Sequence, residues 1–264
     1  MSKTAILTSL DARGVATVTF NRPEVNNAYN EDFIQGVLSG LDDLGKEKSV
    51  RAVVLKGNGR HFQAGADLKW INSVRPQNAA VNRAVSAATA AAVDRLNRLP
   101  VPVVALVQGG CFGGGTGIVA ACDVVIAADN AIFSIAEVRW GLHAAIIVPH
   151  LNDAIGVRQV RRYAITGERF DAQEARRIGL VHEVVALDRL EARGAEIVAQ
   201  ILENSSAAMA KTKQHILESA WSGFDEAAFE RLVDSHASAR QTADAAEGLA
   251  SFAEKRRAAW APKS

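Results

Sequence analysis

The chain has 264 residues, 48% of them apolar, so it is large enough to bury the core of an ordinary domain. Its formal net charge of +1 disfavours a nucleic-acid partner. Its two cysteines have neither disulfide-framework nor metal-site spacing, so we expect no metal and a reducing, cytoplasmic location. We expect no secretory leader and no membrane partner, because prolines and glycines interrupt the uncharged run 99–122.

The first two-thirds of the chain alternates between strand and helix patterns. Runs rich in β-branched residues predict strands over 15–20, 50–55, 103–107, 124–127 and 181–185. Apolar residues at helical spacing predict helices over 34–44, 79–99 and 116–121. Asn30 is a candidate cap of the first helix, and Asp171 with Glu174 has the spacing of a capping box for a helix that ends at Gly179. Strand–helix–strand units of this length indicate parallel crossovers and an α/β fold.

Strand patterns are absent from Leu187 onward. The rest of the sequence predicts helices over 190–202, 207–217, 224–239 and 243–259. These helices are apolar enough to need a partner surface, on the protein's own core or on another subunit. We therefore treat 1–200 as the core that carries the site and 201–264 as a helical subdomain for oligomerisation.

Two turns of small residues carry the strongest functional signal. The first is Ala64-Gly65-Ala66-Asp67, in which Asp67 is placed to start a helix. The second is the glycine triplet 113–115, which opens the predicted helix over 116–121. A helix start has free N–H groups and a partial positive charge, and small residues let a ligand approach the backbone. Two such donors directed at one oxygen form an oxyanion hole, and Glu137 follows as a lone carboxylate.

The residues alone leave other interpretations open. Glycines after a strand are also typical of tight turns and of close helix–sheet packing, and a helix start can hold a phosphate. Glu137 near Arg139 is also typical of a surface ion pair. The absence of the GxxxxGK[ST] and GxGxxG patterns disfavours a nucleotide site.

Short segments along almost the whole chain are similar to those of one known family. They are Asn21-Arg22-Pro23, Asn27-Ala28, 62–67, 113–115, 121–123, Glu137, Gly141-Leu142, 166–170, Ala175, 179–181 and 251–256. In this order they resemble the crotonase superfamily of enoyl-CoA hydratases and isomerases. The resemblance implies a crotonase-like spiral of ββα repeats with a C-terminal helical region. It also implies an acyl-CoA thioester substrate, a homo-trimer or dimer of trimers, and no cofactor, because coenzyme A is part of the substrate.

The resemblance also implies roles for single residues. The N–H groups of Ala66 and Gly114 match the oxyanion hole, and Glu137 matches a catalytic carboxylate. Substrate contacts are expected at Ala64, Gly65, Asp67, Arg60, Gly113, Gly117, His143, Phe252 and Lys255. Among these, 64–66 matches an adenine-binding segment and Arg60 lies where CoA phosphates bind. Phe252 and Lys255 match residues that meet CoA from a neighbouring subunit, and plain surface or core packing is the alternative for all three side chains.

Two departures from the family pattern refine the expectation. The first of the two glutamates that the family's hydratases use maps onto Gly117, and the glycine-rich stretch after Gly141 is replaced by 143–150. Both departures resemble a subgroup that hydrates branched glutaconyl-CoA thioesters, in leucine or acyclic terpene breakdown. We expect Gly117 to make room for a branch at C3. His143, His150 and Arg139 are candidates for binding a distal carboxylate of the acyl chain, and satisfied structural residues are the alternative.

The predicted function is hydration of 3-methylglutaconyl-CoA or isohexenylglutaconyl-CoA across the C2=C3 bond, with Glu137 both activating water and delivering the proton. An enoyl-CoA isomerase is the nearest alternative, because it needs only one carboxylate. A hydratase of linear enoyl-CoA is another. RNA binding and a non-catalytic assembly role are alternatives of other classes, although the near-neutral charge disfavours RNA.

Overall fold

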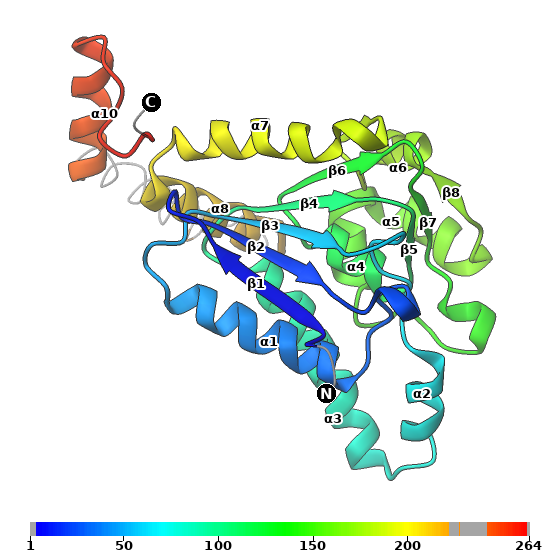
Figure 1. The fold of residues 1–264 in the computed structure, drawn as a ribbon. Helices are drawn as coiled ribbons and strands as arrows, with labels where there is room; N and C mark the ends of the chain where they lie inside the picture. The colour runs from blue at the N-terminus through cyan, green and yellow to red at the C-terminus, as the bar shows by residue number, and fades with distance from the viewer. Residues whose placement is uncertain (1–3, 222–226, 228–241, 263–264) are drawn as a thin grey trace.

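A six-stranded sheet forms the centre of the protein (Figure 1). The computed structural model describes residues 4–221, 227 and 242–262, so the predicted helix over 224–239 lies outside the described residues. The strands in spatial order are β1 (Ile6–Leu10), β2 (Val15–Phe20), β3 (Ala52–Gly57), β4 (Val103–Val107), β6 (Val124–Ala128) and β9 (Glu183–Val185). Strand β1 is antiparallel to β2, and all other neighbours are parallel, as the predicted crossovers require.

Strand β1 does not follow from the sequence pattern. Only Ile6 of this edge strand is buried, and Leu7 and Leu10 are exposed. An edge strand with one buried residue lacks the alternation that marks a half-buried strand.

Helices cover both faces of the sheet (Figure 1). On one face lie α1 (Glu31–Lys46) and α3 (Ala79–Asn97), in contact with each other. On the other face α7 (Leu190–Leu202) packs against β3, β4 and β6. Helix α1 begins where predicted, because the Asn30 side chain accepts a hydrogen bond from the Phe33 N–H at 3.1 Å.

A second, three-stranded sheet consists of β5 (Gly110–Phe112), β7 (Ile132–Ser134) and β8 (Phe170–Asp171). Around it lie the helices α4 (Gly114–Ala120), α5 (Val148–Thr166) and α6 (Ala172–Ile178). The Asp171 cap of α6 and its end at Gly179 are confirmed. Helix α5 is not predicted, because Gly156 interrupts it with φ 74° and breaks the helical pattern.

The remaining elements are short or lie toward the C-terminus. They are α2 (Leu68–Val74), α8 (Ser206–Trp221), α10 (Ala243–Ala253) and the 3-10 turns η1 (Pro23–Val25), η2 (Glu137–Trp140) and η3 (Leu187–Arg189). Helix α10 stands at the edge of the molecule, beyond the end of α7 (Figure 1). It ends earlier than predicted, because Lys255 adopts a left-handed φ of 54° and the Arg256 N–H bonds back to the Ser251 carbonyl at 3.0 Å.

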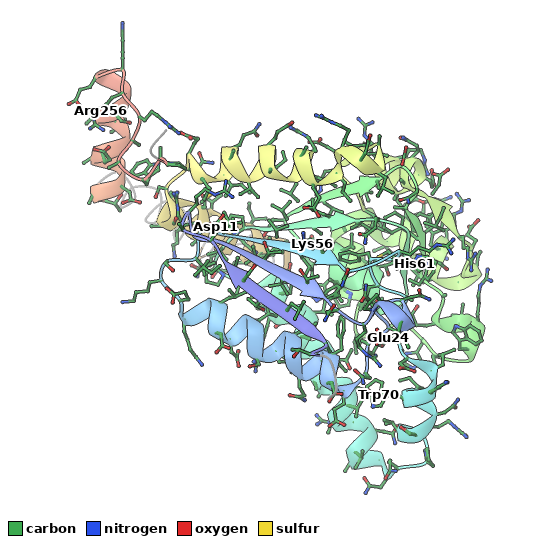
Figure 2. The ribbon with its side chains drawn as sticks, viewed as in Figure 1. Asp11, Glu24, Lys56, His61, Trp70 and Arg256 are labelled. Atoms are coloured by element: carbon green, nitrogen blue, oxygen red, sulfur yellow. The ribbon has the colours of Figure 1, made fainter. Side chains whose placement is uncertain are left out.

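The predicted division between 1–200 and 201–264 falls inside α7, and an oligomerisation role for the second part stays a prediction. Arg256 marks the far end of this part, where it pairs with Glu247 at 2.6 Å (Figure 2). Within the described residues, the search for helices of sufficient length and hydropathy to cross a bilayer yields none.

Candidate active site

The first small-residue turn is held by a buried glutamine. Gln63 accepts a hydrogen bond from the Gly65 N–H at 2.9 Å and donates one to the Gly65 carbonyl at 3.0 Å. Gly65 has a φ of +86°, which an L side chain rarely adopts. The Ala64 N–H donates to the Asn26 carbonyl at 3.0 Å, so the turn is fixed from both sides.

Asp67 starts helix α2, as predicted, and both of its carboxylate oxygens have partners within the protein. Its side chain accepts a hydrogen bond from the Lys69 N–H at 3.1 Å and pairs with Arg22 at 3.2 Å. Both partners are protein groups, and the Asp67 side chain is only 17% exposed. The Asp67 carboxylate therefore has a structural role, and the expected substrate contact of this residue stays a prediction.

The second turn lies directly against the first. Strand β5 hydrogen-bonds to Gln63, with Gln63 N–H to the Gly110 carbonyl at 3.1 Å and Phe112 N–H to the Gln63 carbonyl at 2.9 Å. Gly113 then turns the chain with φ 51° and ψ −123°, and α4 begins at Gly114. A Cβ on Gly115 would lie 2.5 Å from Gln63 Oε1, so only glycine permits this approach.

Each turn has at least one backbone N–H without an acceptor among the described residues. Tyr29 pairs with the first turn through the Gly65 carbonyl and the Asp67 N–H, which leaves the Ala66 N–H outside these pairs. The Gly114 N–H is the first of α4, where no residue of the helix can accept it. The Tyr29 ring contacts the Gly114 position, at 2.8 Å from a Cβ placed there. Convergence of the two amides on one oxygen stays a prediction.

Glu137 lies beside the second turn. It opens η2, and its Oε1 lies 3.1 Å from where a Cβ on Gly113 would be. Its Oε2 is buried and has no hydrogen-bond partner among the described residues. Burial raises the pKa of Glu137, because it disfavours the charged carboxylate. A half-buried acid with one unpartnered oxygen, next to the turn that holds the Gly114 N–H, is suited to hold and release a proton.

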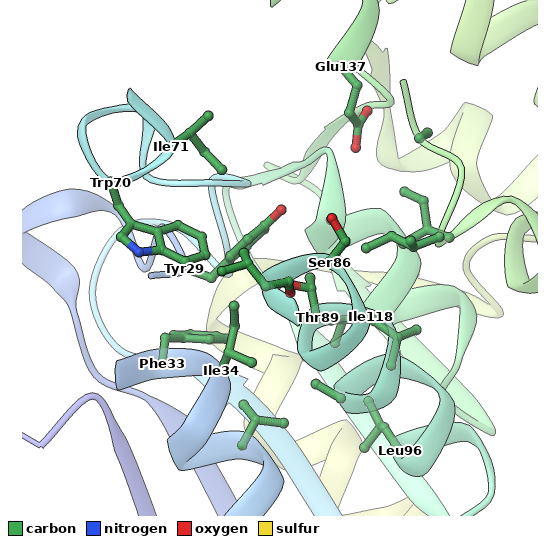
Figure 3. A pocket seen from close by; sticks show the side chains of 18 of the residues that line it. Tyr29, Phe33, Ile34, Trp70, Ile71, Ser86, Thr89, Leu96, Ile118 and Glu137 are labelled. Atoms are coloured by element: carbon green, nitrogen blue, oxygen red, sulfur yellow. The ribbon is translucent and has the colours of Figure 1, made fainter. Parts of the chain in front are cut away.

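Glu137, Gly114 and His143 line one cavity of about 440 Å³. Figure 3 shows the Glu137 carboxylate and the Tyr29 hydroxyl facing the same space. Burial and, secondarily, the charge of Glu137 raise the pKa of Tyr29 to about 12, so its hydroxyl stays protonated and can donate. Trp70, whose ring centroid lies 6.1 Å from that of Tyr29, adds an aromatic wall from α2 (Figures 2 and 3).

The structure corrects the expectation for Gly117. A Cβ on this residue would lie 2.2 Å from Cγ2 of Ile147, which is itself buried at 2% exposure. Ile147 therefore fills the space that a side chain at 117 would take, and Ile147, not Gly117, reaches the cavity wall. The prediction that Gly117 makes room for a branch is wrong.

Of the three candidates for a distal carboxylate, only His143 lines the cavity. Arg139 donates to the Gly167 carbonyl at 2.9 Å, away from the cavity wall. His150 is buried in α5, where burial lowers its pKa and the charges of Asp94 and Asp153 oppose that shift. The role of His143 stays a prediction.

The remaining expected CoA contacts stay predictions. Arg60 is exposed on the loop that leads to the first turn, and Lys255 is exposed after α10. Phe252 lies within α10, and its side chain is outside the described part of the structure. No group of three or more metal-ligating side chains is found among the described residues.

Two residues on which the site depends were not predicted from the sequence. Gln63 joins the two turns, and Tyr29 borders both donors and Glu137. Gln63 lies within the segment 62–67 that carries the family resemblance, and this position was an available signal. Nothing in the sequence around Tyr29 marks it, because its role depends on contacts with residues far along the chain.

Comparison with known proteins places the chain in one family. The profile described as Enoyl-CoA hydratase/isomerase matches residues 11–263. The chain belongs to this family. It is an enzyme, and named hydratases and isomerases of the family are among its relatives.

Three relatives show how far the similarity extends. The mevalonyl-coenzyme A hydratase sidH of Aspergillus fumigatus is 32% identical over 261 residues, covering 97% of this chain and 94% of the relative. The trans-2-decenoyl-[acyl-carrier-protein] isomerase of Streptococcus mutans is 31% identical over 265 residues, covering 96% of both. The structure of Pseudomonas aeruginosa AtuE matches with a TM-score of 0.94 and 36% identity, over 98% of this chain and 100% of that one. The enoyl-CoA hydratase/isomerase fold therefore extends over the whole chain, and an acyl-CoA substrate is expected for the family.

Proposed function

We propose that this protein adds water across the C2=C3 bond of a branched glutaconyl-type CoA thioester, such as 3-methylglutaconyl-CoA or isohexenylglutaconyl-CoA. The observation that carries the proposal is the position of Glu137. Its carboxylate, with Oε2 buried, lies beside Gly113, next to the free N–H of Gly114 and in the same cavity. Membership of the family supplies the thioester, and the resemblance to the glutaconyl subgroup supplies the branch.

The mechanism follows from one carboxylate and two donors. Glu137 removes a proton from water as the water oxygen bonds to C3. The electron pair of the C2=C3 bond moves to the thioester oxygen, where the N–H groups of Ala66 and Gly114 bind the enolate. Glu137 then delivers its proton to C2 on the same face, so the addition is syn and the carboxylate is regenerated. The raised pKa of Glu137 suits this shuttle, because a base that binds its proton more tightly removes it from water more readily.

Glu137→Gln tests this role. We expect the hydration rate to fall by about 10²- to 10⁴-fold, the usual contribution of a positioned acid–base group. Hydration is followed by mass spectrometry in water labelled with heavy oxygen. Glu168→Gln is the matched control, because that carboxylate is paired with Arg162 on the surface and lies outside the cavity wall. Retention of most of the rate in Glu137→Gln would refute the shuttle.

Isomerisation is the second candidate, because a single carboxylate can move a proton between carbons and some relatives are named isomerases. The labelled-water experiment separates the two reactions. A hydratase adds one solvent oxygen at C3, whereas an isomerase changes no mass apart from exchanged hydrogens.

We further propose that the enzyme is a cytoplasmic homo-trimer or dimer of trimers without nucleic acid. Support comes from the resemblance and from the near-neutral charge. The exposed Leu249 of α10, 68% accessible, is a candidate contact between subunits. The mass measured by light scattering separates the trimer from the hexamer.

A further inference from the structure

The active-site cavity continues along helix α3. Its lining residues on this helix recur every three or four positions, so they lie on one face. They are Asn82, Val85, Ser86, Thr89, Ala92, Val93 and Leu96. Figure 3 shows Glu137 at one end of the cavity and Leu96 at the other. From Thr89 to Leu96 the helix rises about 10 Å, at about 1.5 Å per residue.

The far part of this cavity is an apolar channel between α1, α3 and the sheet. Phe33, Val37 and Leu41 of α1 form the wall opposite α3. Val53 and Leu55 of β3 form its floor, both with at most 2% exposure. We call this part, below Thr89, the α1–α3 channel.

Two polar side chains at the entrance of the channel already have partners. The Thr89 hydroxyl donates to the Val85 carbonyl at 2.8 Å. The Asn82 side chain donates to the Gln77 carbonyl at 2.9 Å. Below them the wall consists of aliphatic and aromatic side chains, which can recognise a ligand only by its apolar surface.

We infer that the α1–α3 channel binds an apolar chain of about six to ten carbons carried by the acyl group. An extended chain advances about 1.2 Å per bond, so about eight carbons fit between Thr89 and Leu96. The inference rests on the proposed function and deepens it. It selects, among branched thioesters, those with a long C3 branch over those with a methyl branch, because a methyl group at the reacting carbons does not reach the channel.

Binding of saturated acyl-CoA thioesters tests the channel without any chemistry at C2 and C3. Dissociation constants are measured by calorimetry for butanoyl-, hexanoyl-, octanoyl- and decanoyl-CoA. We expect affinity to rise about three- to fourfold per methylene, as expected for full burial of each group. Equal dissociation constants for butanoyl- and decanoyl-CoA would overturn the inference.

Ala92→Phe places a large side chain inside the channel. Ala92 is 9% exposed and lines the channel. In this variant the dissociation constants of butanoyl- and decanoyl-CoA should therefore differ by no more than about threefold. Ala87→Phe is the matched control: Ala87 is exposed on the same helix, outside the cavity wall, and should keep the wild-type series. Thermal unfolding curves show whether the Ala92→Phe variant is folded. If it is not, the same binding series is measured with Ala92→Leu. A folded Ala92 variant with the wild-type series would contradict the channel.

Turnover separates this inference from the proposed function. Glutaconyl thioesters with a methyl branch and with a six-carbon branch are assayed for hydration beside the binding series. If binding depends on chain length but neither thioester is hydrated, the channel inference stands and the proposed hydration is refuted. If both thioesters are hydrated at equal kcat/KM and the dissociation constants do not change with chain length, the channel inference is refuted and the proposed hydration stands.

Discussion

At the scale of single residues, Glu137 combines a functional position with an unfavourable environment. One of its oxygens is buried without a partner in the described structure, and burial raises its pKa. Glycine at 113 makes this possible, since its φ is +51° and a Cβ there would lie only 3.1 Å from Oε1 of Glu137. A site that holds an acid in such a place sacrifices stability for chemistry.

The raised pKa of Glu137 predicts the pH dependence of activity. The base must be ionised to activate water, so kcat/KM should fall with decreasing pH through a pKa above the ordinary 4.5. A pH profile of kcat/KM for hydration measures this limb. An acidic limb at or below 4.5 would contradict the assignment.

The same shift fixes the sign of its effect on stability. The folded protein binds the Glu137 proton more tightly than the unfolded chain, so this contribution is complete below the ordinary carboxyl pKa and lost as pH rises through the raised one. Glu137→Gln should therefore raise the free energy of unfolding at pH 7, by about 0.5–2 kcal/mol, with no gain in acid. Glu168→Gln should do the opposite, because its hydrogen bond with Arg162 lowers the pKa of Glu168.

At the scale of elements, α4 packs against the start of α5 through the Gly117–Ile147 contact. Gly117→Ala should destabilise the protein by about 1–3 kcal/mol, because the new methyl group meets Ile147 in a packed core. Gly117→Ala with Ile147→Ala should lose less than the sum of the single changes, by about 1 kcal/mol or more. Denaturant unfolding of the wild type, the two single variants and the double variant measures these free energies.

Gly45→Ala is the control for this pair, since α1 leaves open space around Gly45. In an exposed helical position alanine is favoured over glycine, so the variant should be neutral or more stable. Full additivity of the Gly117 and Ile147 changes would show that the two side chains do not compete for one space.

At the scale of the whole molecule, Arg51 ties the C-terminal part to the sheet. Its guanidinium donates to the carbonyls of Leu202 and Asn204 at 2.9 Å and of Trp260 at 2.6 Å. Arg51→Met should cost about 1.5–3 kcal/mol of unfolding free energy and speed proteolysis after 204, because these acceptors lose a charged donor. Mass spectrometry of the fragments and denaturant unfolding measure both effects.

Arg95→Met is the matched control for Arg51. Arg95 pairs with Asp42 on the surface, each 50% exposed, and such pairs contribute about 0–1 kcal/mol. Equal effects of the two variants would show that Arg51 does not anchor the C-terminal part.

The sequence by itself determined the parts of this protein that depend on local backbone requirements. The parallel strands of the six-stranded sheet, the caps at Asn30 and Asp171 and the two small-residue turns were predicted, because periodicity, capping side chains and positive φ leave marks within a few residues. The parallel strands β5 and β7 of the smaller sheet were not predicted, because each has only three residues. Glu137 was also found, although the family resemblance rather than its own spacing singled it out.

Tertiary structure decided what depends on segments distant in the chain. It filled the space at Gly117 with Ile147, engaged Asp67 with Arg22, and brought Tyr29 to Gly114. It also left a channel between α1 and α3 where two apolar stripes predicted only a core. An apolar pattern reports that a face is buried, but the partner that covers it, and any space left between them, is set only when the elements pack together.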